Sequence, residues 1–175
     1  MLIGNQIFLR PLTIDDISDK YIAWMNDYEI VKFTESRFMR HTRESIEEYV
    51  KNANNNNTHT FAIVTNNCNT HVGNIKLGGI NNYHKYADVG LIIGRKEFFG
   101  QGIATESIRL VTDFAFKNLN LHKVWCGIYA PNIGSIKAFQ KAGWEIYATE
   151  PKRCFFESEY VDCVYLHKIN ENIGQ

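Results

Sequence analysis

The chain has 175 residues and no net charge, because 19 basic side chains balance 19 acidic ones. This length suits one domain, and a hydrophobic content of 45% is that of a globular protein. The charge balance argues against a nucleic-acid-binding protein, which usually has a basic excess. No apolar run in the sequence approaches the roughly 20 residues that span a bilayer, and the first residues lack the pattern of a signal peptide. We therefore expect a cytoplasmic protein of one domain, residues 1–175, that binds neither nucleic acid nor membrane.

The cysteines and histidines give no metal-binding pattern. Cys68, Cys126, Cys154 and Cys163 contain no Cys-x-x-Cys pair, and the six histidines contain no His-x-x-x-His pair. Scattered thiols of this kind fit a reducing compartment. We expect no metal and no cysteine nucleophile, since neither Cys126 nor Cys154 is flanked in the sequence by a His or another general base that would deprotonate it.

The first half of the chain predicts two helices and an antiparallel meander. Residues 7–10 form a strand that Pro11 closes, and the capping residues 13–16 begin a helix that runs through Trp24. Residues 29–40 are ambiguous. A second helix starts at Thr42 with an apolar face of 3.6-residue period. Three strands follow, over residues 60–65, 71–80 and 86–93, separated by asparagine-rich turns.

In the second half, strands alternate with helices. A helix over residues 103–119 has a buried stripe at the spacing of one helix face. A strand over residues 123–129 precedes a helix that begins at Asn132 and ends before Gly143. The last strands are expected at residues 144–148 and 157–168, joined by a loop. The order of elements predicts an α+β domain with a mixed, mostly antiparallel sheet flanked by helices.

Gly100-Gln101-Gly102 turns the chain from a strand into a helix. The first N–H groups of a helix lack internal partners, and glycines let an anion approach them, so this loop is a candidate phosphate cradle. The nucleotide P-loop is excluded because Ile103 and Ala104 stand where Lys and Ser or Thr are required. The dinucleotide fingerprint fails because Thr105 replaces its third glycine. A plain glycine turn remains the alternative.

The loop, read as Phe99-Gly100-Gln101-Gly102-Ile103-Ala104, resembles the acyl-CoA pyrophosphate loop of the GCN5-related N-acetyltransferase (GNAT) superfamily. Phe99 departs from the usual Arg or Gln. An aromatic residue there, followed by Ala-Thr-Glu, is similar to the branch of the ribosomal-protein alanine acetyltransferases RimJ and RimL.

Other segments of the chain carry the same resemblance in the family's order. Asn132 and Ser135 match Asn-x-x-Ser, residues 141–144 match Lys-x-Gly-Trp, residues 9–12 match the opening strand, and residues 87–90 match the strand before the loop. The resemblance implies a single GNAT-like domain in which two splayed strands form the acyl-CoA groove, with acetyl-CoA as co-substrate. The implied cofactor contacts are Ile92, Ile93, Phe99, Gly100, Gln101, Gly102, Ile103, Ala104, Thr105, Asn132, Ser135 and Phe139.

The resemblance also implies a mechanism of direct transfer from acetyl-CoA to an amine. Main-chain N–H groups of residues 91–93 would polarise the thioester carbonyl. Asp88 stands where the branch commonly has Glu, and it is the candidate base. Phe139 replaces the tyrosine that often serves as general acid, so Ser135 is the substitute candidate, with Tyr129 or water as alternatives.

The acceptor is the least determined part. The candidate contacts are Trp24, Arg37 and Arg153, and arginines suit an acceptor with phosphate or carboxylate groups. We therefore expect a small-molecule amine such as a nucleotide-linked amino sugar, bound by a monomer or homodimer. A protein N-terminus is the close alternative, and polyamines rank lower because they call for an acidic mouth. A non-catalytic acyl-CoA sensor and a binder of another phosphate ligand are the remaining classes.

Overall fold

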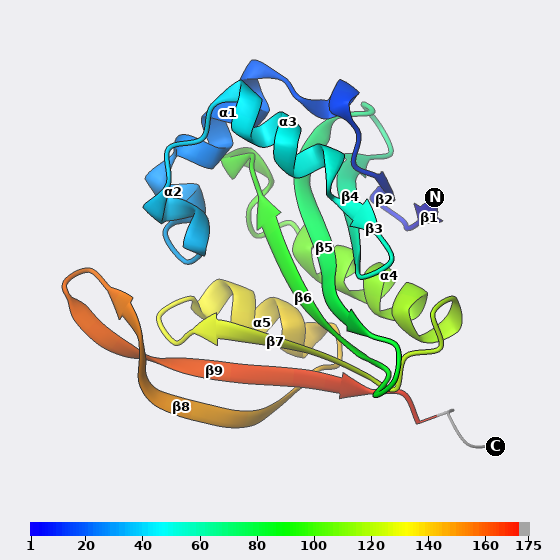
Figure 1. The fold of residues 1–175 in the computed structure, drawn as a ribbon, viewed down its shortest axis with the longest axis vertical. Coiled ribbons are helices and arrows are strands. Elements are labelled where there is room, and N and C mark those ends of the chain that lie inside the picture. The colour runs from blue at the N-terminus through cyan, green and yellow to red at the C-terminus, as the bar shows by residue number, and fades with distance from the viewer. Residues whose placement is uncertain (172–175) are drawn as a thin grey trace.

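A computed structural model describes residues 1–171 and shows one open sheet flanked by helices (Figure 1). The described strands are β1 (Leu2–Ile3), β2 (Ile7–Pro11), β3 (Asn54–Asn55), β4 (Thr58–Thr65), β5 (His71–Asn81), β6 (Tyr86–Ile93), β7 (Lys123–Tyr129), β8 (Glu145–Phe156) and β9 (Glu159–Ile169). The helices are α1 (Asp19–Asn26), α2 (Tyr28–Val31), α3 (Arg43–Lys51), α4 (Ile103–Lys117) and α5 (Ile133–Lys141). Short 3₁₀ turns are η1 (Ile14–Asp16), η2 (Glu35–Phe38) and η3 (Lys96–Phe98).

The sheet is mixed and mostly antiparallel, as the sequence predicts. Its strand order is β1-β2-β4-β5-β6-β7-β9-β8, with β3 added beside β4. Only the β6–β7 pair is parallel among the described strands, because α4 crosses between them, whereas hairpins or longer returns join the others. The predicted α+β class is confirmed.

Alternation of side chains along the strands divides the core between two faces. Leu9 and Ile63 point to a large cluster that includes Ile108 and Val111 of α4. Their neighbours in the strands belong to a second cluster, beneath α1 and α3, in which Tyr21, Trp24, Ile46, Val50, Ala62 and Val64 are buried. Thus α4 covers one face of the sheet, and α1 and α3 cover the other (Figure 1).

Two predicted boundaries differ from the structure. The capping residues 13–16 form η1 instead of starting the helix, and α1 begins later, where the Ser18 hydroxyl accepts from the Tyr21 N–H at 3.2 Å. The loop expected before residue 157 is instead the second half of β8. The turn lies at Glu157 and Ser158, whose φ angles of 46° and 71° are both left-handed. Such a two-residue turn matches the strand twist, but Glu-Ser lacks the glycine or asparagine that usually signals it.

Candidate active site

Strands β6 and β7 separate after a short pairing. Only three residue pairs join them, and Asp88↔Trp125 is the last. Beyond it, β6 continues beside β5 as far as Ile93, while β7 continues beside β9 as far as Tyr129. The two strands therefore splay apart and leave a gap between them (Figure 1), as the resemblance implies.

The backbone of β6 turns unpaired amides toward this gap. The Gly94 N–H donates to the Val72 carbonyl of β5 at 2.8 Å, and Ile93 lies opposite Gly73. Amide directions alternate along an extended strand, so the N–H groups of Leu91 and Ile93 face the gap. The N–H of Ile92 points instead toward β5. The prediction that Ile92 offers its amide to the groove is therefore wrong, whereas Ile93 is oriented as expected.

The glycine loop opens the N-terminus of α4. Gly100 and Gly102 have φ angles of 74° and 84°, which favour residues without a side chain. Gly102 is the N-cap, and no side chain caps the helix. The first helical bond runs from the Glu106 N–H to the Gly102 carbonyl at 3.0 Å, so the N–H groups of residues 103–105 precede the helical ladder. This is the geometry that an anion needs at a helix end.

Glu106 braces this loop from behind, a role that the sequence reading missed. Its carboxylate accepts from the backbone N–H groups of Asn5 and Gln6, in the turn between β1 and β2. Gln6 in turn donates to the Gln101 carbonyl at 3.4 Å, and the Gln101 side chain donates to the Glu97 carbonyl at 2.5 Å. The start of α4 is thereby tied to the first hairpin. Long-range bonds to backbone amides leave no pattern in the sequence.

The side chains of the loop divide between solvent and core. Phe99 is 50% exposed, whereas Ile103 is 3% exposed and packs in the main cluster. Ala104 and Thr105 are half-buried in the first turn. Residues 103–105 can therefore meet a ligand mainly through their backbone, and the exposed ring of Phe99 is free to contact it.

Helix α5 begins as predicted. The Asn132 side chain accepts from the Ser135 N–H at 3.2 Å, which confirms Asn132 as the N-cap. Ser135 itself is half-buried in the first turn. Phe139 is 1% exposed, and its ring packs on Trp144 with centroids 4.7 Å apart. Phe139 is therefore a core residue in this structure, and its contact with the cofactor stays a prediction.

Asp88 lies at the closed end of the gap, where β6 is paired on both sides. It faces Gly78 of β5 and Trp125 of β7. A strand rises about 3.3 Å per residue, so Asp88 is roughly 10 Å from Leu91 and 16 Å from Ile93 along β6. A base at Asp88 therefore acts most directly on an acyl group near Leu91, and needs a chain of waters if the acyl group lies at Ile93.

Each of the predicted acceptor residues has contacts of its own within the protein. Trp24 is 6% exposed and packs against Tyr21 and His71, with ring centroids 5.5 and 5.0 Å away. Arg37 donates to the carbonyls of Lys32, Thr34 and Phe155, and so ties η2 to β8. Trp24 and Arg37 thus both have structural contacts, and a contact of either with the acceptor stays a prediction.

Arg153 stands on β8, not on a loop. It forms an ion pair with Glu150 at 3.2 Å, with more than half of the side chain exposed. The Glu150 carboxylate also accepts from the Tyr165 hydroxyl at 2.8 Å. The structure thus gives Arg153 a surface partner and does not place it beside Trp24.

The open space nearest the end of β6 is a hollow of about 270 Å³ beside α1. It is lined by Lys20, Ala23, Trp24, Asp27, Ile30, Gly94, Arg95, Lys96 and Glu97. Its two acidic groups are already paired: Asp27 with Lys96 at 2.6 Å, and Glu97 with Arg95 at 3.5 Å. The lining has three basic side chains and two acidic ones, so the hollow is not the acidic entrance that a polyamine would favour.

Titratable groups near the gap are not activated nucleophiles. Burial raises the pKa of the Cys126 thiol to about 12 and that of Cys154 to about 11. Burial, and then the hydrogen bond to Glu35, raise the pKa of Tyr129, whose hydroxyl donates to that carboxylate at 2.9 Å. The thiols therefore stay protonated at neutral pH, as expected of structural cysteines.

Within residues 1–171, no three His, Cys, Asp or Glu side chains are grouped as metal ligands. In the same part of the chain, no helix has the length and apolar character to cross a membrane.

Comparisons with known proteins agree with this geometry. A family model described as an acetyltransferase (GNAT) domain matches residues 6–145. The chain is 28% identical over 151 residues to the probable N-acetyltransferase YjcK of Bacillus subtilis (strain 168), covering 82% of this chain and 83% of that protein. It is 23% identical over 170 residues to the spermidine N(1)-acetyltransferase of Escherichia coli (strain K12), covering 94% and 89%.

Two solved structures share the fold. One is the spermidine N-acetyltransferase from Vibrio cholerae in complex with CoA and spermine, with a TM-score of 0.83, 23% identity and coverage of 95% of this chain and 96% of that one. The other is an acetyltransferase of the GNAT family from Bacillus anthracis, with a TM-score of 0.80, 18% identity and coverage of 96% and 97%.

Proposed function

This chain belongs to the GNAT family and is an acetyl-CoA-dependent N-acetyltransferase, and on that premise we propose that it acetylates the primary amine of a small metabolite. The transfer is direct, from the thioester to the amine. The observation that carries the proposal is the gap between β6 and β7, together with the uncapped N-terminus of α4 on the segment that follows β6.

The start of α4 and the open edge of β6 can bind a CoA thioester through their backbone N–H groups. The free N–H groups of residues 103–105 suit the pyrophosphate, because the helix dipole adds positive potential at that end. One gap-facing N–H group, that of Leu91 or that of Ile93, suits the carbonyl oxygen, on which negative charge develops as the amine attacks. Each donor is fixed in the fold before the ligand binds, so little reorganisation is needed.

Asp88 is the proposed base. The acceptor arrives as an ammonium ion and must lose a proton before it can attack. Asp88 is half-buried at the closed end of the gap, where its carboxylate can take that proton through a chain of waters or hold the cationic acceptor. Ser135 is the proposed donor to the leaving thiolate. A CoA thiolate is a stable leaving group, so this second role contributes less.

The charges of the hollow support an acceptor that also bears an anionic group. Its acidic side chains are neutralised by Lys96 and Arg95, which leaves Lys20 without an acidic partner in the lining. A nucleotide-linked amino sugar combines a primary amine with phosphates, and it is our first candidate. Spermidine is the second, favoured by the names of two relatives. A protein N-terminus, as in the RimJ and RimL branch, is the third.

The test is a thermal-shift titration with acetyl-CoA, CoA and NADH, followed by an acceptor screen that measures CoA thiol release. We expect both CoA forms to stabilise the protein and NADH to have no effect. The screen should include a nucleotide-linked amino sugar, spermidine and a peptide with a free N-terminus. No shift with either CoA form would overturn the proposal. A shift without turnover on any amine would indicate an acyl-CoA sensor.

A further inference from the structure

Strand β5 contains a bulge opposite β4, and only β6 separates it from the gap. Ile63 pairs with Gly73 and Val64 pairs with His71, so Val72 is one extra residue opposite β4. An extra residue reverses the alternation of side chains. His71 and Asn74, three positions apart, therefore point to the same face, where the His71 ring contacts Tyr21 and Trp24 of α1.

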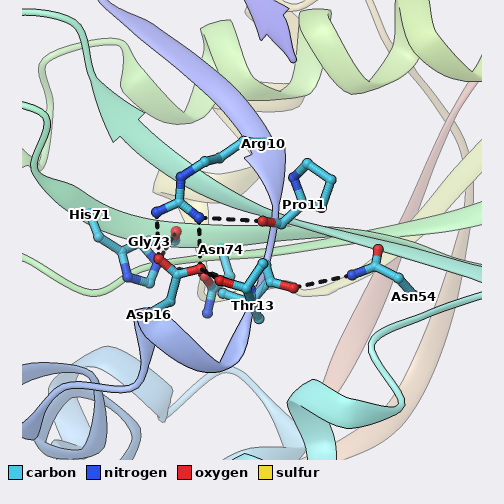
Figure 2. A network of polar contacts seen from close by, with 9 residues as sticks. Arg10, Pro11, Thr13, Asp16, Asn54, His71, Gly73 and Asn74 are labelled. Atoms are coloured by element: carbon cyan, nitrogen blue, oxygen red, sulfur yellow. Dashed lines mark hydrogen bonds and ion pairs between the residues drawn. The ribbon is translucent and has the colours of Figure 1, made fainter.

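His71 holds this bulge from within. Its Nε2 lies 3.0 Å from the Gly73 carbonyl oxygen and 2.8 Å from the Asn74 side-chain oxygen (Figure 2). Both partners are acceptors, so the Nε2 carries the hydrogen and donates. Next to it lies Asp16, which is buried and accepts from Arg10 at 2.7 Å (Figure 2). The imidazole is thus fixed by packing on one side and by two acceptors on the other.

The bulge lies directly against the part of β6 that borders the gap. Gly73 is paired with Ile93, and the two strands are so close that a Cβ on Gly73 would be 2.2 Å from the Ile92 carbonyl oxygen. That carbonyl shares one planar peptide unit with the Ile93 N–H, and the two groups point in opposite directions. The close packing of the Ile92 carbonyl on Gly73 therefore determines the direction in which the Ile93 N–H points into the gap.

A second close approach fixes the same segment from the other side. A Cβ on Gly94 would be 2.0 Å from the Trp24 indole, so Trp24 lies directly on the backbone that follows Ile93. Trp24 also packs on the His71 ring. His71 therefore touches both supports of the Ile92–Ile93 peptide: the bulge beneath it and the indole that covers Gly94.

We propose that His71 is a positioning residue for acetyl transfer: by bonding the Gly73 carbonyl, it aims the Ile93 N–H at the thioester carbonyl. This inference rests on the proposed function. In this arrangement, His71 contacts neither acetyl-CoA nor the amine. Loss of the His71 hydrogen bond should therefore weaken the binding of acetyl-CoA, whose carbonyl contacts the Ile93 N–H, and leave the binding of CoA unchanged.

The test compares His71→Phe, which keeps the ring packing but removes the donor, with His71→Gln, which keeps an N–H donor near the Nε2 position. We expect kcat to fall about tenfold or more in His71→Phe, since small misplacements of catalytic groups are costly. The affinity for acetyl-CoA should fall relative to the affinity for CoA, because only acetyl-CoA has the carbonyl. His71→Gln should retain kcat within about threefold.

Gly73→Ala provides a second route if His71→Phe does not fold, because the added methyl meets the Ile92 carbonyl itself. Gly90→Ala is its control on β6, where an added Cβ meets nothing within 4 Å. Unchanged kcat in both His71→Phe and Gly73→Ala would overturn the inference, as would equal losses in His71→Phe and His71→Gln. If the wild-type protein binds neither CoA nor acetyl-CoA, the proposed function is wrong. If it binds and turns over acetyl-CoA but the variants keep its kcat, only the role of His71 is wrong.

Discussion

Gly102 is restricted both by its backbone conformation and by its place next to the proposed binding site of an anionic ligand. Its φ of 84° lies in the left-handed region, and it directly precedes the three unbonded amides of α4. Asp and Asn tolerate this region better than other side chains, and both can accept from helix-end N–H groups. The two substitutions therefore separate the effect of shape from the effect of charge.

We predict that Gly102→Asp raises the Kd for CoA by about 100-fold or more, because a carboxylate would compete for the amides and repel the pyrophosphate. Gly102→Asn should weaken binding much less, while both variants stay folded. Isothermal titration with CoA, together with circular dichroism, checks this. Equal loss in the two variants would mean that the space at the loop, not its potential, determines binding.

At Asp88 the expected effect is on turnover rather than on affinity. The carboxylate stands at the closed end of the gap, away from the glycine loop. We predict that Asp88→Ala lowers kcat about 100-fold, in the range of general base catalysis, with the Kd for acetyl-CoA unchanged. Single-turnover kinetics measure the rate of acetyl transfer, and titration with acetyl-CoA measures the Kd. Wild-type kcat in the variant would remove Asp88 from the mechanism.

Strand β6 shows how one element can be bonded on one edge and open on the other. Amides at Ile92 and Gly94 point to β5, whereas those at Leu91 and Ile93 face the gap. We predict that the second pair exchanges hydrogen much faster than the first in the free protein. Acetyl-CoA should slow the exchange at Leu91 and Ile93. Amide-resolved exchange by NMR measures this, and uniform protection along β6 would contradict the assigned directions.

Buried polar groups under α1 make stability depend on pH. Burial outweighs the Asn74 hydrogen bond and lowers the pKa of His71 below its unfolded value of about 6.5. The unfolded chain therefore binds this proton first as pH falls, so stability is full above about pH 6.5 and decreases below it.

We predict that His71→Gln flattens the decline in unfolding free energy between about pH 7 and pH 5, because the titrating imidazole is gone. Chemical denaturation at several pH values measures the slope. His84→Gln, at an exposed histidine, is the matched control. A wild-type slope in His71→Gln would show that other groups cause the decline.

Asp16 acts in the same direction at lower pH. Burial alone would raise its pKa, but the hydrogen bonds from Arg10 and the Thr13 N–H outweigh burial and lower it. Its contribution is therefore present above about pH 3.9, the unfolded value, and is lost as pH falls through the lower folded value.

At the scale of the molecule, the gap divides the sheet into two parts joined by only three residue pairs between β6 and β7. A ligand in the gap contacts both parts and binds only the folded state. We predict that CoA at 100 times its Kd stabilises the protein by about 2.7 kcal/mol, and so raises the Tm by roughly 5 to 11 °C. Calorimetry measures the shift, and Gly102→Asp should lose it at the same CoA concentration.

Sequence patterns of short range determined most of the fold and the local backbone geometry of the proposed site. The strand of residues 86–93, the helix that begins after Gly102 and the Asn132 cap all lie where their local patterns predict. Each depends on neighbours in the chain: alternation, glycine at positive φ, or a side chain that bonds an amide three residues on. The proposed CoA loop is of this kind, because its helix end and its two glycines are adjacent in the sequence.

Only the tertiary structure decided which groups face the gap and which face the core. Phe139 and Ile92 lie in segments that match the family, yet packing buries the first and strand pairing turns the amide of the second away. Arg37 and Trp24 are committed to contacts with residues far along the chain. The bracing of α4 by Glu106 and the bulge at His71 likewise join distant segments. Such contacts depend on the register and spacing of whole elements, which no local pattern of residues records.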